Sequence, residues 1–237
     1  MKDIDKIQYK DYFTSKEISN YIFGDEENNN SSKIYYYIMQ LTNEGKIEKI
    51  GRNKYRLNEE KKKIFKCDYS NQLINIKDKI TKQFPNLAFQ IWENSFLNEF
   101  LNHQISENTI FIDVENGLYD FIYDYLTNEE QYIVLVKPSK EDYYRYQKNN
   151  IIVLDRLISE SPKNKFCKNS PALEKLIIDV IASKYIDIDK PELISAITEI
   201  NNKYQLNYST LTRYAKRRNK YRQITELLQN FMDDNKE

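Results

Sequence analysis

Two acidic side chains, Asp113 and Glu115, stand at the end of a predicted strand, and Lys137 ends the next predicted strand along the chain. Restriction-type nucleases place an acid on one strand and an acid-x-Lys motif on the next, where they hold a metal ion and position the attacking water. The residue two positions before Lys137 is Leu135, which offers no metal ligand. Half of such a metal site is missing, so a nuclease-like enzyme is a weakly supported function for this chain.

Other residue types that commonly bind metals are scarce. The single histidine, His103, and the two distant cysteines, Cys67 and Cys167, make no zinc-binding spacing. His103 follows a predicted helix, where we expect it to lie on the surface. The sequence also lacks the glycine-rich loop that cradles a phosphate. We therefore expect no metal, no cofactor and no catalytic residue.

A second group of side chains has the chemistry of DNA contact. Lys33 can neutralise a phosphate, and Gln40 can pair with an adenine edge. Three consecutive tyrosines, 35 to 37, cannot all be buried on one helix, so at least one hydroxyl is expected to reach solvent or a phosphate. The predicted DNA-binding residues are Ser32, Lys33, Tyr36, Gln40, Arg52 and Lys54.

The elements that would position these side chains are three helices and a hairpin. Residues 4–12 are the candidate first helix, with Ile4, Ile7 and Tyr12 facing inward. A second helix begins after an N-cap at Thr14 or Ser15, with an acid in its first turn. A polar loop over residues 24–30 separates it from the third helix.

The third helix begins at Ser31 or Ser32 and carries Ile34, Ile38 and Leu41 on one apolar stripe. Gly45 stands just past its end, where a left-handed residue is common. Two short apolar runs then flank a Gly-Arg-Asn turn, which predicts a hairpin over residues 47–57. This order predicts a winged helix-turn-helix. Such domains also serve as protein-interaction modules, and a cationic hairpin tip is often only a solvated turn.

A second concentration of positive charge lies near the C-terminus. The stretch NYSTLTRYAKRRNKY, residues 207–221, predicts a helix capped by Ser209. Its cations are Arg213, Lys216, Arg217, Arg218 and Lys220. Such a helix could contact DNA or RNA phosphates, dock on an acidic protein surface, or present a solvated basic face.

The middle of the chain alternates strands and helices. Strands are predicted at residues 87–92, 109–114, 132–136 and 151–154, and the almost wholly apolar run 132–136 is expected to be central. Helices are predicted from Ser95, over residues 118–126 and over residues 139–147, and further helices begin near Pro171 and Pro191. This alternation indicates right-handed crossovers and a mainly parallel sheet.

The predicted fold class is therefore α+β joined to α/β. We expect a winged helix-turn-helix at residues 1–58, a linker and connecting helix at 59–84, and an α/β domain at 85–237 with a C-terminal helical part from residue 161. Net charge is +3 for residues 1–66, −7 for 67–160 and +4 for 161–237, so any DNA contact is expected at the two ends. No apolar run is long enough for a membrane helix and no signal peptide is apparent, so a cytoplasmic protein is expected.

Five segments of the chain resemble a known family. They are GKIEKIGRNKYRL, FQIWENSFLNEFLNHQ, IIVLDRLISESP, PALEKLIIDVIAS and NYSTLTRYAKRRNKY, of which LEKLIID and STLTRYAKRR are the most specific. Together they resemble the AbiEi-family antitoxins of type IV toxin-antitoxin systems, which act in phage abortive infection. The resemblance implies a protein without enzymatic activity that represses its own operon through the winged helix and opposes a nucleotidyltransferase-like toxin.

Three hypotheses follow from these observations. The first is an antitoxin that binds promoter DNA, possible partners being the toxin and a second copy of the chain on an inverted repeat. The second is a transcriptional repressor without a toxin. The third is a nuclease-like enzyme on the central sheet. A neighbouring nucleotidyltransferase-like reading frame would distinguish the first hypothesis from the second.

Overall fold

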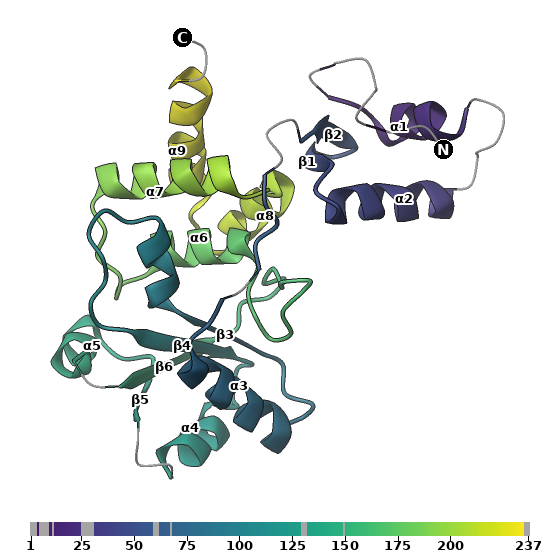
Figure 1. The fold of residues 1–237 in the computed structure, drawn as a ribbon. Helices are drawn as coiled ribbons and strands as arrows, with labels where there is room; N and C mark the ends of the chain where they lie inside the picture. Colours follow the sequence, from purple (N-terminus) through teal and green to yellow (C-terminus); the bar gives the residue numbers. More distant parts are fainter. Residues whose placement is uncertain are drawn as a thin grey trace. The chain divides into compact units, whose positions relative to one another are not determined.

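The computed structural model describes residues 4, 10, 12–24, 31–58, 62–66, 68–128, 132–148 and 150–234. The chain forms two compact units (Figure 1). The smaller unit contains residues 1–65 together with 200–213, and the larger unit contains residues 66–199 together with 214–237. No helix in the described part of the chain is long and apolar enough to cross a membrane.

The helices of the smaller unit begin and end as their sequence predicts. Helix α1, Ser15–Phe23, is closed by a capping box in which Thr14 and Glu17 bond each other's backbone N–H groups. Helix α2, Ser31–Asn43, ends in a Schellman motif, with the Lys46 N–H donating to the Leu41 carbonyl at 2.9 Å. Gly45 takes the left-handed position of this motif at φ +70°.

A hairpin follows α2 directly. Strand β1, Ile47–Gly51, pairs antiparallel with β2, Lys54–Leu57, and Asn53 occupies the turn at φ +54°. Figure 1 shows the hairpin beside α2, and the side chains of both elements contribute to one core. The buried members of this core are Ile4, Phe13, Ile18, Ile22, Ile38, Leu41, Ile47 and Tyr55.

Two features of the smaller unit differ from expectation or lie beyond what the structure describes. The expected first helix and the loop before α2 fall largely outside the described residues; Ile4 is buried as predicted, but Tyr12 is 42% exposed rather than inward-facing. Residues 200–213, expected among the C-terminal helices, join this unit. Lys63 pairs with Tyr204 in a parallel bridge, and the Gln205 side chain donates to the Ile47 carbonyl.

The larger unit is built on a four-stranded, mainly parallel sheet, as predicted. Its order is β3 (Phe89–Glu93), β4 (Thr109–Val114), β6 (Ile151–Arg156) and β5 (Ile133–Val136). Strands β4, β6 and β5 run parallel, and β3 is antiparallel to β4. The expectation of a central strand at 132–136 is wrong: β5 is an edge strand, and its last residue, Val136, is 38% exposed.

Helices cover both faces of this sheet (Figure 1). On one face, α3 (Asn71–Gln83) and α4 (Tyr119–Thr127) pack on the apolar positions of the strands. Three buried residues of α3, Leu73, Ile76 and Ile80, belong to this core, although the sequence suggested only a connecting helix there. In α4, Ile122 and Leu126 are buried, whereas Phe121 is 63% exposed.

The other face is covered by α6, Leu173–Ala182, whose first nine residues are all buried. This helix begins at Leu173 rather than at the predicted Ser170-Pro171, and its N-cap, Ala172, makes no side-chain cap. A 3-10 helix, Asn94–Glu99, replaces the α-helix expected from Ser95. The remaining helices are α5 (Lys140–Tyr146), α7 (Lys190–Lys203), α8 (Tyr208–Arg217) and α9 (Tyr221–Asp234).

Candidate functional site

The exposed side of α2 carries most of the predicted DNA-binding residues. Ser32, Tyr36 and Gln40 are spaced by four residues and therefore share one side of the helix. Tyr35 and Tyr36 are each 65% exposed, which confirms that at least one tyrosine of the triplet reaches solvent. Tyr37 instead packs edge-on against Phe23, with ring centroids 4.6 Å apart.

Two of the predicted DNA-binding side chains interact with other side chains of the protein. The Gln40 amide donates to Glu44 at 2.8 Å, so it would have to leave this bond to pair with a base. The Lys33 ammonium lies 4.8 Å from the centroid of the Phe23 ring, a cation–π contact that its flexible stem can exchange for a phosphate. These contacts hold both side chains near the surface of α2 without burying them.

The hairpin tip supplies the other two predicted cations. Arg52 is exposed and makes no ion pair with any described residue. Lys54 lies 4.3 Å above the Tyr12 ring. Asn53, between them, accepts a hydrogen bond from the Ser15 backbone at 3.0 Å, which fixes the tip to the start of α1.

The predicted basic helix is interrupted. Helix α8 ends at Arg217, and Asn219 at φ +56° closes a second Schellman motif in which the Lys220 N–H donates to the Ala215 carbonyl at 2.8 Å. The N-terminal cap is also different from expectation. The Asn207 side chain, not Ser209, accepts from the Thr210 N–H at 3.0 Å.

The cations of this segment do not form one free patch. Arg217 pairs with Glu160, and the Arg218 Nε lies 3.1 Å from Asp179. The Lys216 ammonium lies 4.7 Å from the centroid of the Tyr221 ring. Arg213 and Lys216 are exposed on α8, whereas Lys220 stands just before α9.

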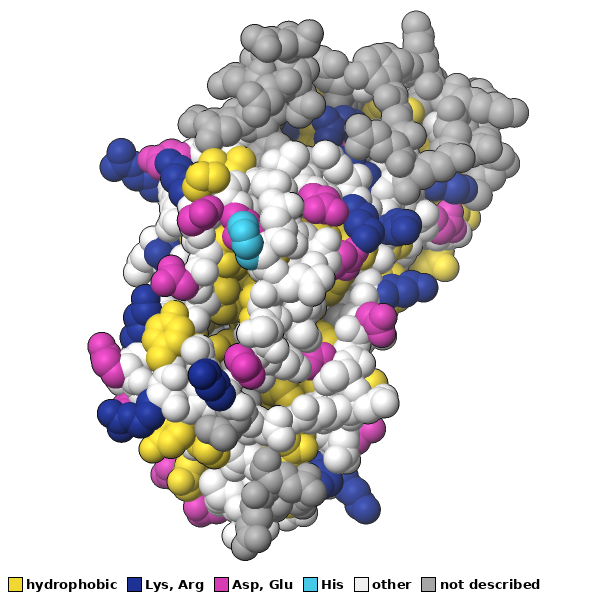
Figure 2. Space-filling model, turned by 60° about the vertical axis from the view of Figure 1, so that its left-hand side comes forward, with side chains coloured by type: hydrophobic (Ala, Val, Ile, Leu, Met, Phe, Trp, Pro, Cys, Tyr) yellow, Lys and Arg dark blue, Asp and Glu magenta, His cyan; other side chains and the backbone are white. Residues whose placement is uncertain are grey.

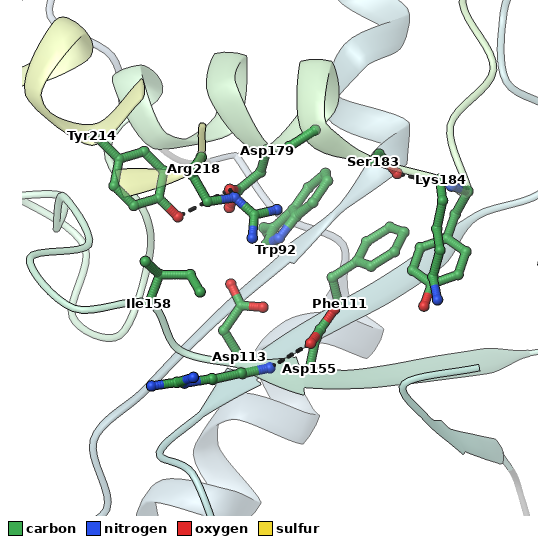
Figure 3. A pocket seen from close by; sticks show the side chains of 13 residues that line it. Trp92, Phe111, Asp113, Asp155, Ile158, Asp179, Ser183, Lys184, Tyr214 and Arg218 are labelled. Atoms are coloured by element: carbon green, nitrogen blue, oxygen red, sulfur yellow. Dashed lines mark hydrogen bonds and ion pairs between the residues drawn. The ribbon is translucent and has the colours of Figure 1, made fainter. Parts of the chain in front are cut away.

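A buried charged cluster, absent from the sequence-based expectations, lies between the sheet and α6. Lys175 is 1% exposed, and its ammonium contacts Asp113 at 2.5 Å and also Asp179 one turn along the helix. The Tyr214 hydroxyl donates to the second oxygen of Asp179 at 3.0 Å. Together these contacts connect β4, α6 and α8 through buried side chains. Figure 3 shows the Tyr214–Asp179 part of the cluster, with Asp113 below it.

Burial determines the titration of this cluster. Loss of hydration raises the pKa of Asp113 to about 6, with Lys175 opposing the rise and Asp179 adding to it. Burial alone would lower the pKa of Lys175, but attraction to Asp113 and Asp179 outweighs it and raises that pKa, so the lysine is charged. Burial likewise raises the pKa of the Tyr214 hydroxyl, which stays a hydrogen-bond donor.

The candidate nuclease residues are not brought together. Strand β6 lies between β4, which carries Asp113, and β5, which precedes Lys137. Glu115 and Lys137 are both exposed, and the Lys137 ammonium lies 4.1 Å from the centroid of the Tyr119 ring. Among the described residues, no group of three or more His, Cys, Asp and Glu side chains could hold a metal ion.

The single histidine is a surface residue, as predicted. The His103 side chain is 90% exposed and its Nδ1 lies 3.4 Å from Glu192. Figure 2 shows it in cyan on the molecular surface. Cys167 is a free thiol, and Cys67 lies outside the described residues.

A family model described as a family of unknown function, DUF6577, matches residues 33–234. The chain belongs to this family. The match begins in α2, includes the hairpin and all four strands of the sheet, and ends with α9. No curated protein matches the chain.

Proposed function

We propose that this protein is an antitoxin of a type IV toxin-antitoxin system that binds its own promoter. In this proposal the smaller unit is a winged helix-turn-helix, with α2 as the recognition helix and the β1–β2 hairpin as the wing. The larger unit counteracts a nucleotidyltransferase-like toxin. The observation that carries the DNA-binding part is the pair of tyrosines, Tyr35 and Tyr36, exposed side by side on α2.

The exposed tyrosines favour a contact surface over a solvated helix. Large aromatic side chains stabilise a fold mainly when they are buried, so two at 65% exposure contribute little to this unit. A tyrosine hydroxyl can donate to a phosphate, and its ring can contact a sugar or a thymine methyl. Lys33 and Arg52 add positive charge to the same helix and to the hairpin that follows it.

The antitoxin part rests on the resemblance to AbiEi-family antitoxins. Its two most specific segments, LEKLIID and STLTRYAKRR, contain Asp179 and two residues that contact its side chain, Tyr214 on α8 and Arg218 just after this helix. These two segments are therefore in direct contact through residues of the larger unit. This supports reading them as one functional element, in which the exposed cations of α8 are the part available to a toxin.

The proposal is tested by co-expressing the chain with the adjacent gene and scoring growth with and without it. Rescue of growth supports the antitoxin function, and the absence of any toxic neighbour would leave a stand-alone DNA-binding repressor. Lys216→Glu combined with Arg217→Glu is expected to impair rescue. Arg218 is left unchanged in this variant, because its ion pair with Asp179 would confound the result with loss of stability.

A further inference from the structure

A cavity of about 260 Å³ opens in the larger unit at the carboxyl ends of β4 and β6 (Figure 3). In open sheets with parallel strands, ligands commonly bind at this edge, because the strand ends and the following loops converge there. Ligand cavities usually measure ~300–1,000 Å³, so this one lies just below that range and has room only for a small ligand. Neither the proposed DNA surface nor the proposed toxin contact uses it.

The deep wall of the cavity carries two adjacent carboxylates. Asp113 on β4 and Asp155 on β6 are register partners, so both side chains leave the same face of the sheet about 4.8 Å apart at the backbone. Each has one oxygen engaged. Asp113 uses Oδ2 for Lys175, and Asp155 uses Oδ1 for the Arg156 N–H at 2.6 Å. Their other oxygens accept no hydrogen bond from the described residues.

Asp179 is the third carboxylate of the cavity, and both of its oxygens already have partners within the protein. Lys175 occupies one of its oxygens, and Tyr214 and Arg218 approach the other. A ligand would therefore meet two acceptor oxygens, on Asp113 and Asp155. Such a pair fits two neighbouring hydroxyl donors.

Stacked aromatic side chains line the cavity beside the carboxylates. Trp92 and Phe111 are register partners two residues before this row, and their rings stack with centroids 4.5 Å apart at 18°. Tyr185 continues the stack from the segment after α6, with its ring centroid 6.2 Å from that of Phe111. Because the ring faces cover one another, and Trp92 and Phe111 are only 4% and 6% exposed, the cavity meets uncharged ring edges. Such edges suit the C–H groups of a sugar.

The cations lie nearer solvent than the carboxylates. Arg156 and Lys184 are exposed, and the Arg218 side chain is 27% exposed, whereas the side chains of Asp113 and Asp179 are 13% and 10% exposed. Lys184 lies above the Tyr185 ring at 5.1 Å. Positive charge at the mouth attracts an anionic group and repels a basic side chain.

We propose that this cavity binds a small phosphorylated sugar, either free or as part of a nucleoside monophosphate. Two hydroxyls donate to Asp113 and Asp155, the C–H groups of the sugar contact the ring edges of Trp92 and Phe111, and the phosphate stays at the mouth beside Arg156. Arginine suits that position because its planar guanidinium bonds phosphate in a bidentate manner. This inference is independent of the proposed promoter and toxin binding.

The full chain offers its own reporter for this site, because Trp92 is its only tryptophan. Ribose 5-phosphate, adenosine monophosphate, ribose and inorganic phosphate are titrated separately, with Trp92 fluorescence and calorimetry as readouts. The variants are Asp155→Asn, Arg156→Ala and the control Arg222→Ala. Arg222 has a 95% exposed side chain on α9 and does not line the cavity. Circular dichroism checks that each variant is folded.

Ribose 5-phosphate is expected to bind the wild-type chain more tightly than ribose or inorganic phosphate. Arg156→Ala and Asp155→Asn should each weaken binding by at least about tenfold, since each removes a charge-assisted hydrogen bond, while Arg222→Ala should not. If adenosine monophosphate binds more tightly than ribose 5-phosphate, the base contributes to binding and the ligand is a nucleotide. If it does not bind more tightly, the base adds nothing and the ligand is the free sugar phosphate.

Three results would overturn the assignment. They are no binding of either phosphorylated sugar at millimolar concentration, inorganic phosphate binding as tightly as ribose 5-phosphate, or affinities unchanged by both cavity variants. Arg156→Ala is the decisive variant if Asp155→Asn fails to fold, because its side chain is exposed. Promoter binding measured on the same proteins keeps a failure of the cavity assignment distinct from a failure of the proposed function.

Discussion

The Tyr214 hydroxyl on α8 donates a hydrogen bond to Asp179 on α6 at 3.0 Å, and Tyr214 is 1% exposed. This bond joins two helices through residues that lie 35 positions apart in the sequence. The Asp179 carboxylate accepts this bond on one oxygen and contacts the Lys175 ammonium with the other. The contact therefore belongs to the interior of the larger unit, even though the surrounding sequence is rich in cations.

Tyr214→Phe is expected to lower the free energy of unfolding by about 1–3 kcal/mol, because a buried carboxylate loses a hydrogen-bond donor. Urea denaturation followed by circular dichroism measures the change. Tyr221→Phe is the matched control: Tyr221 is 43% exposed, and its variant should stay within about 0.5 kcal/mol of wild type. Equal effects of the two variants would contradict a specific role for the buried hydroxyl.

Lys175→Met should be the most damaging single change in the larger unit. It leaves Asp113 and Asp179 buried without their shared cation, which is expected to destabilise by about 3–5 kcal/mol. Adding Asp113→Leu to this variant should recover part of the loss, since it removes one of the uncompensated carboxylates. Thermal unfolding of both variants tests this expectation, and an unchanged melting temperature for Lys175→Met would refute it.

The buried cluster should also make stability depend on pH. The pKa of Asp113 is raised from 3.8 to about 6 in the folded chain, so the folded state binds more protons than the unfolded state between those values. The contribution of this group to stability is therefore present at low pH and declines as pH rises from about 4 to about 6. Relative to Asp113→Asn, the wild-type chain should lose stability over this interval. A constant difference between the two proteins would show that Asp113 does not titrate there.

Substitution of Gly45, which follows α2, tests whether its positive φ requires glycine, and substitution of Gly51 in the hairpin is the control. Gly45→Ala places a Cβ at φ +70°, where its nearest neighbour, the Lys62 carbonyl oxygen, is 3.7 Å away; the expected loss is therefore about 1–2 kcal/mol from backbone strain alone. Gly51 does not have positive φ, and its nearest neighbour to an added Cβ is also at 3.7 Å. Gly51→Ala should consequently be close to neutral in the same denaturation experiment.

Local signals in the sequence predicted local structure well. An N-cap at Thr14 or Ser15, a left-handed Gly45 and the bounds of β4 depend on neighbouring residues and were predicted; the structure places the cap at Thr14. The edge position of β5 was not, because a short apolar run is compatible with either a central or an edge strand. Only the pairing of strands distant in sequence decides between them.

The buried charged cluster around Lys175 was not predicted from the sequence, for a related reason. Charged residues such as Lys175 and Asp179 are usually exposed on a helix, yet the first nine residues of α6 are all buried. Their partners, Asp113 and Tyr214, are far away in sequence, and nothing local indicates the pairing. The joining of residues 200–213 to the smaller unit is likewise a long-range contact that local patterns do not encode.

The salt dependence of promoter binding tests the central claim most directly. Fluorescence anisotropy of the chain's own promoter is measured from low to moderate salt for wild type, Lys33→Ala with Arg52→Ala, and the control Arg222→Ala. If both cations contact phosphates, the slope of log affinity against log salt should fall in magnitude by about 1.8 in the double variant and stay unchanged in the control. A wild-type chain that does not bind its promoter, or a double variant with the wild-type slope and affinity, would contradict DNA binding through α2 and the hairpin.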